Sequence, residues 1–320
     1  MKFFINKKHN YDFDEFLNNN FLKYKNKSKN KALFYGLEWV LNDNLAKIKF
    51  ENKLIKKKIF INNSIPCDLG NENFLEVIER QDYFDEIFSS CPYTSKFLNK
   101  DYKTTKYKYL PIPTYSENLF VKYNTRCSSK KFDVVFCGGV HSKEHTYMLK
   151  TIRKFKNIVM SYDNRLNRNF FKWPFFLNYQ PFLPNKKKWD NFHNAKILIG
   201  TNLLYLNKKQ IKNFKKIPNI KNFHNYDVVC QKKILPQMKT RMIEAASTKT
   251  LFLVKKDEWN VIENWFTPGK DFIYWTNYND LYEKIFDITK NFNNYNNILD
   301  SAANKVKQFY FEGFMKKILT

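Results

Sequence analysis

An arginine and a glutamate three residues apart, in LPQMKTRMIEAASTKTLFLV (235–254), are the side chains best placed to do chemistry. On a helical wheel, Arg241 and Glu244 fall together beside an apolar stripe. A helix beginning near Gln237 would present backbone amides next to Lys239 and Arg241, and this combination suits a diphosphate. Glu244, one turn further on, can accept a hydrogen bond from a ribose or sugar hydroxyl. The alternative is an ordinary surface ion pair between Arg241 and Glu244, which contributes little to stability.

A second candidate lies in FCGGVHS (136–142), where two glycines follow a run of buried-type residues. Gly138 and Gly139 fall where a parallel strand would turn into a helix, and ligands of such sheets bind beyond the carboxyl ends of the strands. Glycine lets the backbone approach a phosphate closely, and Ser142 can add a hydroxyl or cap the helix. Two glycines also occur in ordinary strand-to-helix turns, so phosphate binding and a plain turn both stay open.

Two further motifs imitate metal sites. HSKEH (141–145) has the form of an inverted zinc-peptidase motif, which needs both histidines on one helix and a third ligand downstream. Here His141 falls in the expected turn, and no clear third ligand follows. DFD (12–14) imitates a carboxylate pair that grips a metal-bound diphosphate, but Asp12 and Asp14 near the N-terminus suit helix-start charges better. We interpret both motifs as coincidences and expect no metal site.

The familiar signatures of other enzyme classes are missing. The chain contains no G-x-S-x-G, no P-loop and no G-x-G-x-x-G sequence, so hydrolases, P-loop NTPases and dehydrogenases lack support. Aromatic residues alternate with lysines throughout, yet no RNA-recognition or zinc-finger signature accompanies them. We therefore expect no specific nucleic-acid partner.

The elements that must position these residues alternate between strands and helices. Such alternation predicts parallel βαβ units, and it starts afresh after a boundary between about 115 and 130. We therefore expect two domains, 1–125 and 126–320, with residues 1–30 as a peripheral start. The clearest expected elements are strands at 58–62, 132–137 and 157–163, helices within 71–84 and 143–155, and a pair of helices within 279–311.

Composition narrows the class further. The chain has 320 residues, of which 43% are hydrophobic and 27% charged, so it should fold as about two domains. We find no apolar run of the roughly 18 residues that span a membrane and no signal peptide. Five widely spaced cysteines without a C-x-x-C pair indicate intracellular free thiols. The net charge of +26 either attracts an anionic partner or reflects codon usage, since the lysines are spread along the chain.

The C-terminal half, about residues 130–310, resembles GT-B glycosyltransferases of the group 1 and spore-maturation-like branch. The resemblance is an ordered series: the glycine turn, an Arg-x-x-Glu-Ala helix, a strand, a loop with a glycine and an acidic residue, and an Asp-Leu helix start. The matching residues are Arg241, Glu244, Ala245, Leu251–Val254, Phe266, Gly269, Asp271, Asp280 and Leu281.

This resemblance implies a fold of two Rossmann-like domains that face a central cleft, with the last helix crossing back to the first domain. The helix near Gln237 would face the diphosphate of a nucleotide sugar, and Glu244 would face the ribose or donor sugar. The N-terminal domain would take the acceptor. There Glu38, in GLEW, is a candidate base or acceptor contact, with an ordinary surface carboxylate as the alternative. The family needs no bound metal and no cofactor, because helix amides and cationic side chains meet the donor charge.

The function expected from the resemblance is transfer of a sugar from a nucleoside diphosphate to a glycan, lipid-linked or protein acceptor. The expected location is the cytoplasm, with peripheral contact to the anionic inner face of a membrane left open. The alternative is a catalytically inactive GT-B-like basic module that binds nucleic acid or another anionic partner.

Overall fold

The computed structural model divides the chain into two compact units, and we treat each by itself. It describes residues 1–5, 11–27, 29–36, 55–62, 66–111, 115–125, 127, 129–161, 177–181 and 184–319. Unit 1 consists of Met1–Glu117, Leu203–Met238 and Gln308–Thr320, and unit 2 of Asn118–Asn202 and Lys239–Lys307. The sequence-based boundary at residue 125 placed residues 203–238 and 308–320 in the second domain, whereas the structure groups them with unit 1.

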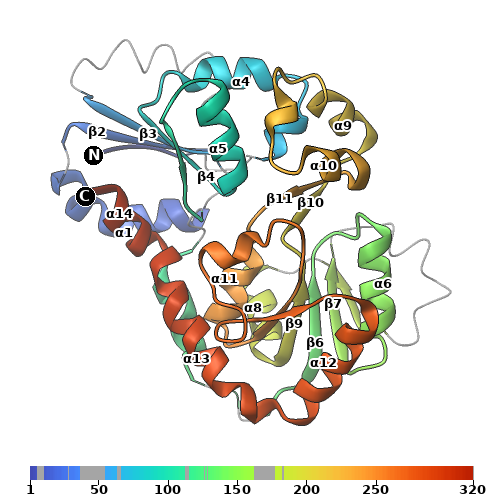
Figure 1. Ribbon diagram of the computed structural model, residues 1–320. Helices are drawn as coiled ribbons and strands as arrows, with labels where there is room; N and C mark the ends of the chain where they lie inside the picture. The colour runs from blue at the N-terminus through green and yellow to red at the C-terminus, as the bar shows by residue number, and fades with distance from the viewer. Residues whose placement is uncertain are drawn as a thin grey trace. The chain divides into compact units, whose positions relative to one another are not determined.

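Unit 1 is built on a parallel sheet of five strands in chain order (Figure 1). Its strands are β1 (Lys2–Ile5), β2 (Lys31–Tyr35), β3 (Lys57–Asn62), β4 (Glu86–Ser89) and β5 (Tyr107–Tyr109), and its first helices are α1 (Tyr11–Lys27), α4 (Phe74–Gln81) and α5 (Pro92–Asp101). The apolar residues of β3 are buried on both faces of the sheet, as in other parallel sheets.

Strand β1 and helix α1, within the first thirty residues, contribute to the unit 1 core, so the expectation of a peripheral start is wrong. Strand β1 pairs in parallel with β2, and Phe13 of α1 is fully buried. Phe13, Phe16 and Leu17 are spaced to form one apolar face of α1, but many asparagines and lysines around them conceal this periodicity. Asp12 and Asp14 lie in the first turn of α1, where negative charge is favourable.

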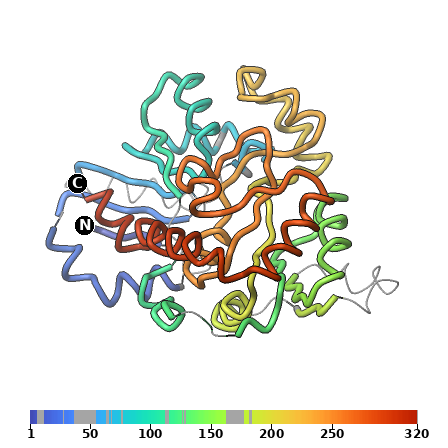
Figure 2. Tube along the Cα trace, turned by 60° about the horizontal axis from the view of Figure 1, so that its bottom comes forward, coloured from blue at the N-terminus to red at the C-terminus, as the bar shows by residue number. Residues whose placement is uncertain are grey.

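Two later segments complete unit 1. Residues 203–238 contribute the antiparallel pair β10 (Leu203–Tyr205) and β11 (Ile234–Pro236), with α9 (Lys208–Phe214) and α10 (Tyr226–Lys232) between them. The last helix, α14 (Phe311–Leu319), packs Phe311 against Phe13 and Phe16. Both chain ends therefore lie together in unit 1 (Figure 2), which confirms the expected return of the C-terminal helix.

Unit 2 is built on a parallel sheet of six strands in the order β13-β12-β9-β6-β7-β8. Its strands are β6 (Phe132–Cys137), β7 (Asn157–Ser161), β8 (Tyr179–Pro181), β9 (Ala195–Gly200), β12 (Leu251–Lys255) and β13 (Ile273–Trp275). From β8 to β13, this is the strand order 3-2-1-4-5-6 of doubly wound sheets. The direction of the chain reverses between β6 and β9, so ligands are expected at the carboxyl ends of these two strands.

The unit 2 helices pack in two groups on the sheet. Helices α6 (Lys143–Ile152) and α12 (Tyr278–Lys290) share one core cluster with the sheet, formed in part by Met148, Leu149, Leu281 and Ile285. The other α-helices of unit 2 in the described residues are α8 (Asn185–His193), α11 (Thr240–Ser247) and α13 (Asn296–Lys305). Because side chains of a strand alternate between faces, Phe136 contacts the α6 side while Cys137 points to the side of α8 and α11.

The sequence-based elements of unit 2 are largely confirmed. Strand β6 has the predicted bounds, and the expected helix after the glycine turn begins at Lys143 with Met148, Leu149 and Ile152 buried. Phe155 lies beyond the end of α6, although it packs partly against the same core. The mixed α/β fold of two parallel-sheet units is as expected.

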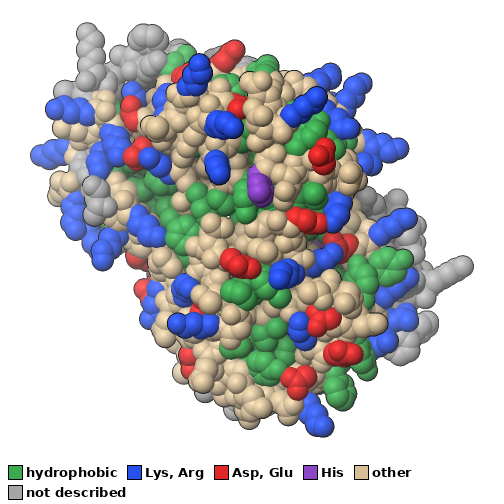
Figure 3. Space-filling model, viewed as in Figure 1, with side chains coloured by type: hydrophobic (Ala, Val, Ile, Leu, Met, Phe, Trp, Pro, Cys, Tyr) green, Lys and Arg blue, Asp and Glu red, His purple; other side chains and the backbone are tan. Residues whose placement is uncertain are grey.

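Three further observations concern the charged surface, the membrane-spanning potential of the helices and the cysteines. Lys and Arg side chains are scattered over the face shown in Figure 3. In the part of the chain that the structure describes, no helix combines the length and apolarity needed to cross a membrane. Cys91, Cys127, Cys137 and Cys230 are free thiols.

Candidate functional site

The candidate site lies in unit 2, at the carboxyl ends of β6 and β9. The chain leaves β6 through Gly138, whose φ of +148° is a conformation that side chains rarely adopt. The chain leaves β9 through Gly200, and a Cβ there would lie 3.0 Å from Cε of Met242. Glycine at this second position therefore lets helix α11 pack closely on the strand end.

Helix α11 begins at Thr240, three residues later than expected. Pro236 is the last residue of β11, and Lys239 occupies the N-cap position with extended backbone and no side-chain capping bond. The Lys239 amide donates instead to Oδ1 of Asn202, at 3.1 Å. This hydrogen bond fixes the start of α11 to the chain segment that follows β9.

The guanidinium of Arg241 covers the glycine turn. A Cβ on Gly138 would lie 3.2 Å from both Cζ and Nη2 of Arg241. The structure therefore brings together these two sequence-predicted residues. Burial raises the pKa of the Cys137 thiol, while a hydrogen bond and the charge of Arg241 act in the opposite direction. The Cys137 thiol is therefore held in its protonated form.

Glu244 is buried, so its interpretation as a surface ion-pair partner is wrong. Its side chain is 1% exposed, and Oε1 accepts hydrogen bonds from Nζ of Lys188 and, at 3.1 Å, from Nε1 of Trp189. Lys188 is itself 5% exposed. A buried carboxylate requires such partners because the loss of hydration is costly. Helix α8 thus holds the Glu244 side chain in place beside the site.

Ser142 has the capping role that the sequence suggested. Its Oγ accepts a hydrogen bond from the amide of His145, at 3.2 Å, and so begins helix α6. Nδ1 of His145 in turn accepts from the amide of His141, at 3.3 Å. The His141 ring lies against Gly139, where a Cβ would be only 2.1 Å from Nε2. A side chain at Gly139 would therefore displace the exposed His141 ring.

The site is strongly cationic. Burial, together with the nearby positive charges of His141, Lys239 and Arg241, lowers the pKa of His145 to about 3. Lys239 and Arg241 therefore lie close enough to His145 to repel its proton. Two permanent cations beside a glycine turn are suited to an anion with two charged groups. Among the described residues, no group of three or more His, Cys, Asp and Glu side chains is placed to hold a metal ion.

Phe266 and Asp271 carry the family resemblance, and both lie in the chain between β12 and β13. Phe266 is buried and packs edge-on against Phe252 of β12. The carboxylate of Asp271 accepts hydrogen bonds from the Thr267 amide and the Ser301 hydroxyl, so it closes the loop onto α13. These residues stabilise the strand that precedes the loop rather than line the glycine turn.

Some site residues were not found from the sequence. Asn202 follows a strand at the reversal point, so the strand-end rule should have indicated it. Lys188 and Trp189 lie more than fifty residues before Glu244, and no local pattern indicates that they pair with it. Glu38 lies outside the described residues, so its role stays a prediction.

Acid should weaken the fold through His145. Its pKa is about 3 in the folded chain, below the ordinary value of 6.5. The unfolded chain therefore takes up a proton that the folded chain does not, as pH falls from 6.5 toward 3, so stability is full above 6.5 and declines below it. His145→Gln keeps a hydrogen-bond acceptor without this titration. Urea unfolding of both proteins between pH 4 and 7 should show a steeper loss for the wild type, and parallel curves would contradict the assignment.

Comparison with known proteins finds matches among solved structures. No protein-family model and no curated protein sequence matches the chain. Solved structures do match: TarM (11% identity, TM-score 0.57, 90% of this chain and 54% of that one), and a sucrose-phosphate synthase from Thermosynechococcus elongatus (9%, 0.59, 93% and 74%). Anabaena HepE in complex with UDP and glucose also matches (8%, 0.58, 90% and 76%).

These similarities are similarities of fold. The chain has the GT-B fold of these glycosyltransferases, and it spans about half the length of TarM.

Proposed function

We propose that the chain is a glycosyltransferase that moves a sugar from a nucleoside diphosphate to a glycan, lipid-linked or protein acceptor. The observation that carries the proposal is the Arg241 guanidinium over Gly138, at the strand ends where doubly wound sheets bind nucleotides. The fold supports it, since HepE is in complex with UDP and glucose and the O-GlcNAc transferase GtfA with UDP and GlcNAc.

In this reaction the bond between the sugar C1 and the diphosphate oxygen breaks, and its electron pair stays on the diphosphate. An acceptor hydroxyl forms the new bond to C1 and loses its proton to a base. Arg241 and Lys239 stabilise the negative charge that develops on the leaving diphosphate, and cations fixed in place before the reaction are the effective kind. Because these side chains and helix amides neutralise the donor, the reaction uses no metal and no cofactor.

The other residues have supporting roles in the proposal. In the proposal, the diphosphate approaches the backbone of Gly138 and Gly139 once the Arg241 and His141 side chains that lie over these glycines turn toward it, and Ser142 keeps the first turn of α6 in place. Lys188 and Trp189 hold the buried Glu244 carboxylate, and the proposal requires a local opening on donor binding so that Glu244 can accept a hydrogen bond from a hydroxyl of the ribose or donor sugar. Glu38 remains the proposed base or acceptor contact. The proposed location is the cytoplasm, with an optional peripheral contact to the inner face of an anionic membrane.

Nucleotide-induced stabilisation tests the donor site without knowledge of the acceptor. A nucleoside diphosphate at about one hundred times its Kd should add roughly 3 kcal/mol to the free energy of unfolding. We expect UDP or GDP to raise Tm in a saturable manner, and the rise should persist in EDTA. Scanning fluorimetry with UDP, GDP and ADP measures this.

Two outcomes would contradict parts of this proposal. A rise in Tm that EDTA abolishes would make the site metal-dependent. No response to any nucleotide, together with salt-dependent binding of a random oligonucleotide, would favour the inactive basic module.

A further inference from the structure

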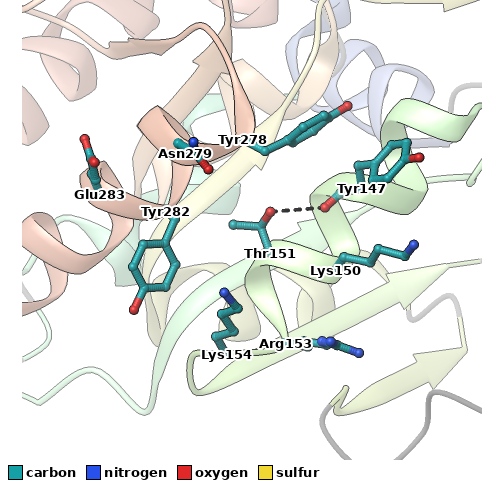
Figure 4. A pocket seen from close by; sticks show the side chains of 9 residues that line it. All are labelled: Tyr147, Lys150, Thr151, Arg153, Lys154, Tyr278, Asn279, Tyr282 and Glu283. Atoms are coloured by element: carbon teal, nitrogen blue, oxygen red, sulfur yellow. Dashed lines mark hydrogen bonds between the residues drawn. The ribbon is translucent and has the colours of Figure 1, made fainter.

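A groove of about 330 Å³ lies on the surface of unit 2, between helices α6 and α12 (Figure 4). Residues of α6 and of the turn after it form one wall, and residues of α12 form the other. Each wall is held from below, because Leu149 of α6 and Leu281 of α12 are fully buried in one core cluster. The groove is therefore a formed feature of unit 2, since its walls are fixed by the packing of both helices on the sheet.

Three tyrosines line the groove. The rings of Tyr147 and Tyr278 meet across it with centroids 5.2 Å apart, and Tyr282 follows one turn along α12. Tyr147 and Tyr282 are 45% and 38% exposed, which is high for such large aromatic side chains. Exposed aromatic rings with hydroxyl groups offer an apolar face and a hydrogen-bonding tip at the same time.

The α6 wall adds positive charge. Lys150, Arg153 and Lys154 all line the groove, against the carboxylate of Glu283 on the α12 wall. The ammonium of Lys150 lies 4.9 Å from the centre of the Tyr147 ring, and that of Lys154 lies 4.8 Å from the centre of the Tyr282 ring. Two of the groove tyrosines are therefore each paired with a cation through a cation–π contact.

We infer that this groove is a docking subsite for an anionic glycan, the acceptor of the proposed transferase, and this inference rests on that proposed function. Tyrosine rings stack on the apolar faces of sugar rings, and the Asn279 amide and the Glu283 carboxylate bind hydroxyl groups. The cations bind the phosphate, carboxylate or sulfate groups that such a glycan carries.

Two other anionic partners fit less well. A membrane surface favours a convex patch of large apolar side chains, whereas this site is concave and lined by tyrosine hydroxyls. A nucleic-acid strand carries one phosphate per nucleotide, and the carboxylate of Glu283 on the groove wall opposes such a run of charge. A sugar hydroxyl, in contrast, is a partner that this carboxylate can accept from.

The position of the groove suits an acceptor. Helix α6 follows β6 and α12 follows β13, so both helices begin at the sheet edge where the glycine turn lies. Tyr147 comes five residues after Ser142, which is about 7.5 Å along a helix. Along α6, the first groove residue therefore lies about one and a half turns from Ser142, on the same unit as the proposed donor site.

Direct binding to the intact chain tests the inference without any transfer reaction. The probe is a sulfated tetrasaccharide, titrated by calorimetry at about 0.15 M salt so that long-range attraction to this basic protein is screened. We expect the double variant Tyr147→Ala/Tyr282→Ala to weaken binding about tenfold or more, and Lys150→Glu/Lys154→Glu to do the same. The unsulfated tetrasaccharide should bind more weakly than the sulfated one.

Matched controls separate the groove from general surface charge. Phe21→Ala removes an exposed ring of unit 1, and Lys270→Glu reverses an exposed charge of unit 2 outside the groove; both should bind like the wild type. The inference is overturned if the groove variants keep full affinity or if the controls lose as much. It is also overturned if a tetranucleotide or anionic vesicles prove to be the tighter groove-dependent ligand.

The same samples distinguish this inference from the proposed function. Stabilisation by a nucleoside diphosphate without groove-dependent glycan binding would overturn only the docking subsite. Glycan binding in the groove without a response to any nucleotide would overturn the donor site.

Discussion

Replacement of Lys188 by methionine is expected to lower the free energy of unfolding by about 3–5 kcal/mol, because it leaves the Glu244 carboxylate buried without its cation. Glu244 is 1% exposed, so water cannot replace the lost partner without local opening. Trp189 retains its hydrogen bond to the carboxylate but brings no charge. Urea unfolding followed by tryptophan fluorescence and circular dichroism measures the change.

A double variant controls for the size of the side chains. Lys188→Met combined with Glu244→Leu removes both charges and should recover much of the lost stability, since an apolar pair tolerates burial. The exposed pair of Lys209 and Glu72 offers a matched surface control, where Lys209→Met should change stability by less than about 1 kcal/mol. A single Lys188 variant as stable as the wild type would show that Glu244 does not carry a buried charge.

Replacement of Arg241 by alanine is expected to abolish most donor binding. The guanidinium is the cation that covers the glycine turn, and a charge-assisted hydrogen bond contributes about 1.5–3 kcal/mol, or roughly 10- to 150-fold in Kd. Turnover should fall by about 100-fold or more, since the charge on the leaving diphosphate grows in the transition state. Calorimetry with UDP or GDP and release of the free sugar measure the two effects.

The controls for Arg241 examine charge and geometry. Arg241→Lys keeps the charge but not the planar fork, so it should recover part of the binding. Gly138→Ala should also weaken binding, because the new Cβ would crowd the guanidinium at a backbone angle that alanine rarely adopts. Lys270→Ala, on an exposed turn of the same unit, should bind as the wild type does. Undiminished nucleotide binding by Arg241→Ala would remove the observation on which the proposed function depends.

The elements whose structure depends on neighbouring residues in the chain were predicted from the sequence. Strand β6 is an uninterrupted apolar run that ends at two glycines, and α6 shows buried residues at helical spacing, so both were predicted from the sequence. Gly138 and Arg241 were predicted separately, one from a turn and the other from a helix. Their contact depends on strand order, since β9 lies between β6 and β12 in the sheet.

The features that the sequence did not predict depend on contacts between residues that lie far apart in the chain. The sequence predicted Glu244 as a donor contact, with a surface ion pair to Arg241 as the alternative, but it did not indicate burial or the partner Lys188, which comes from another helix. Helix α11 was expected to start at Gln237, but Pro236 pairs with Leu203 in an antiparallel ladder and the chain reaches helical backbone only at Thr240. Pairings over such separations leave no periodic trace in the sequence.

The return of the last helix to unit 1 has a consequence for biosynthesis. Lys31 donates to the carbonyl oxygen of Ile318 across a separation of 287 residues, and Phe311 packs on the first helix of the chain. On the ribosome, unit 1 must therefore wait with part of its apolar surface uncovered until the final segment emerges, while unit 2 already has all its strands. Vectorial folding thus favours completion of unit 2 first, and the nascent sheet of unit 1 is where chaperones are expected to bind.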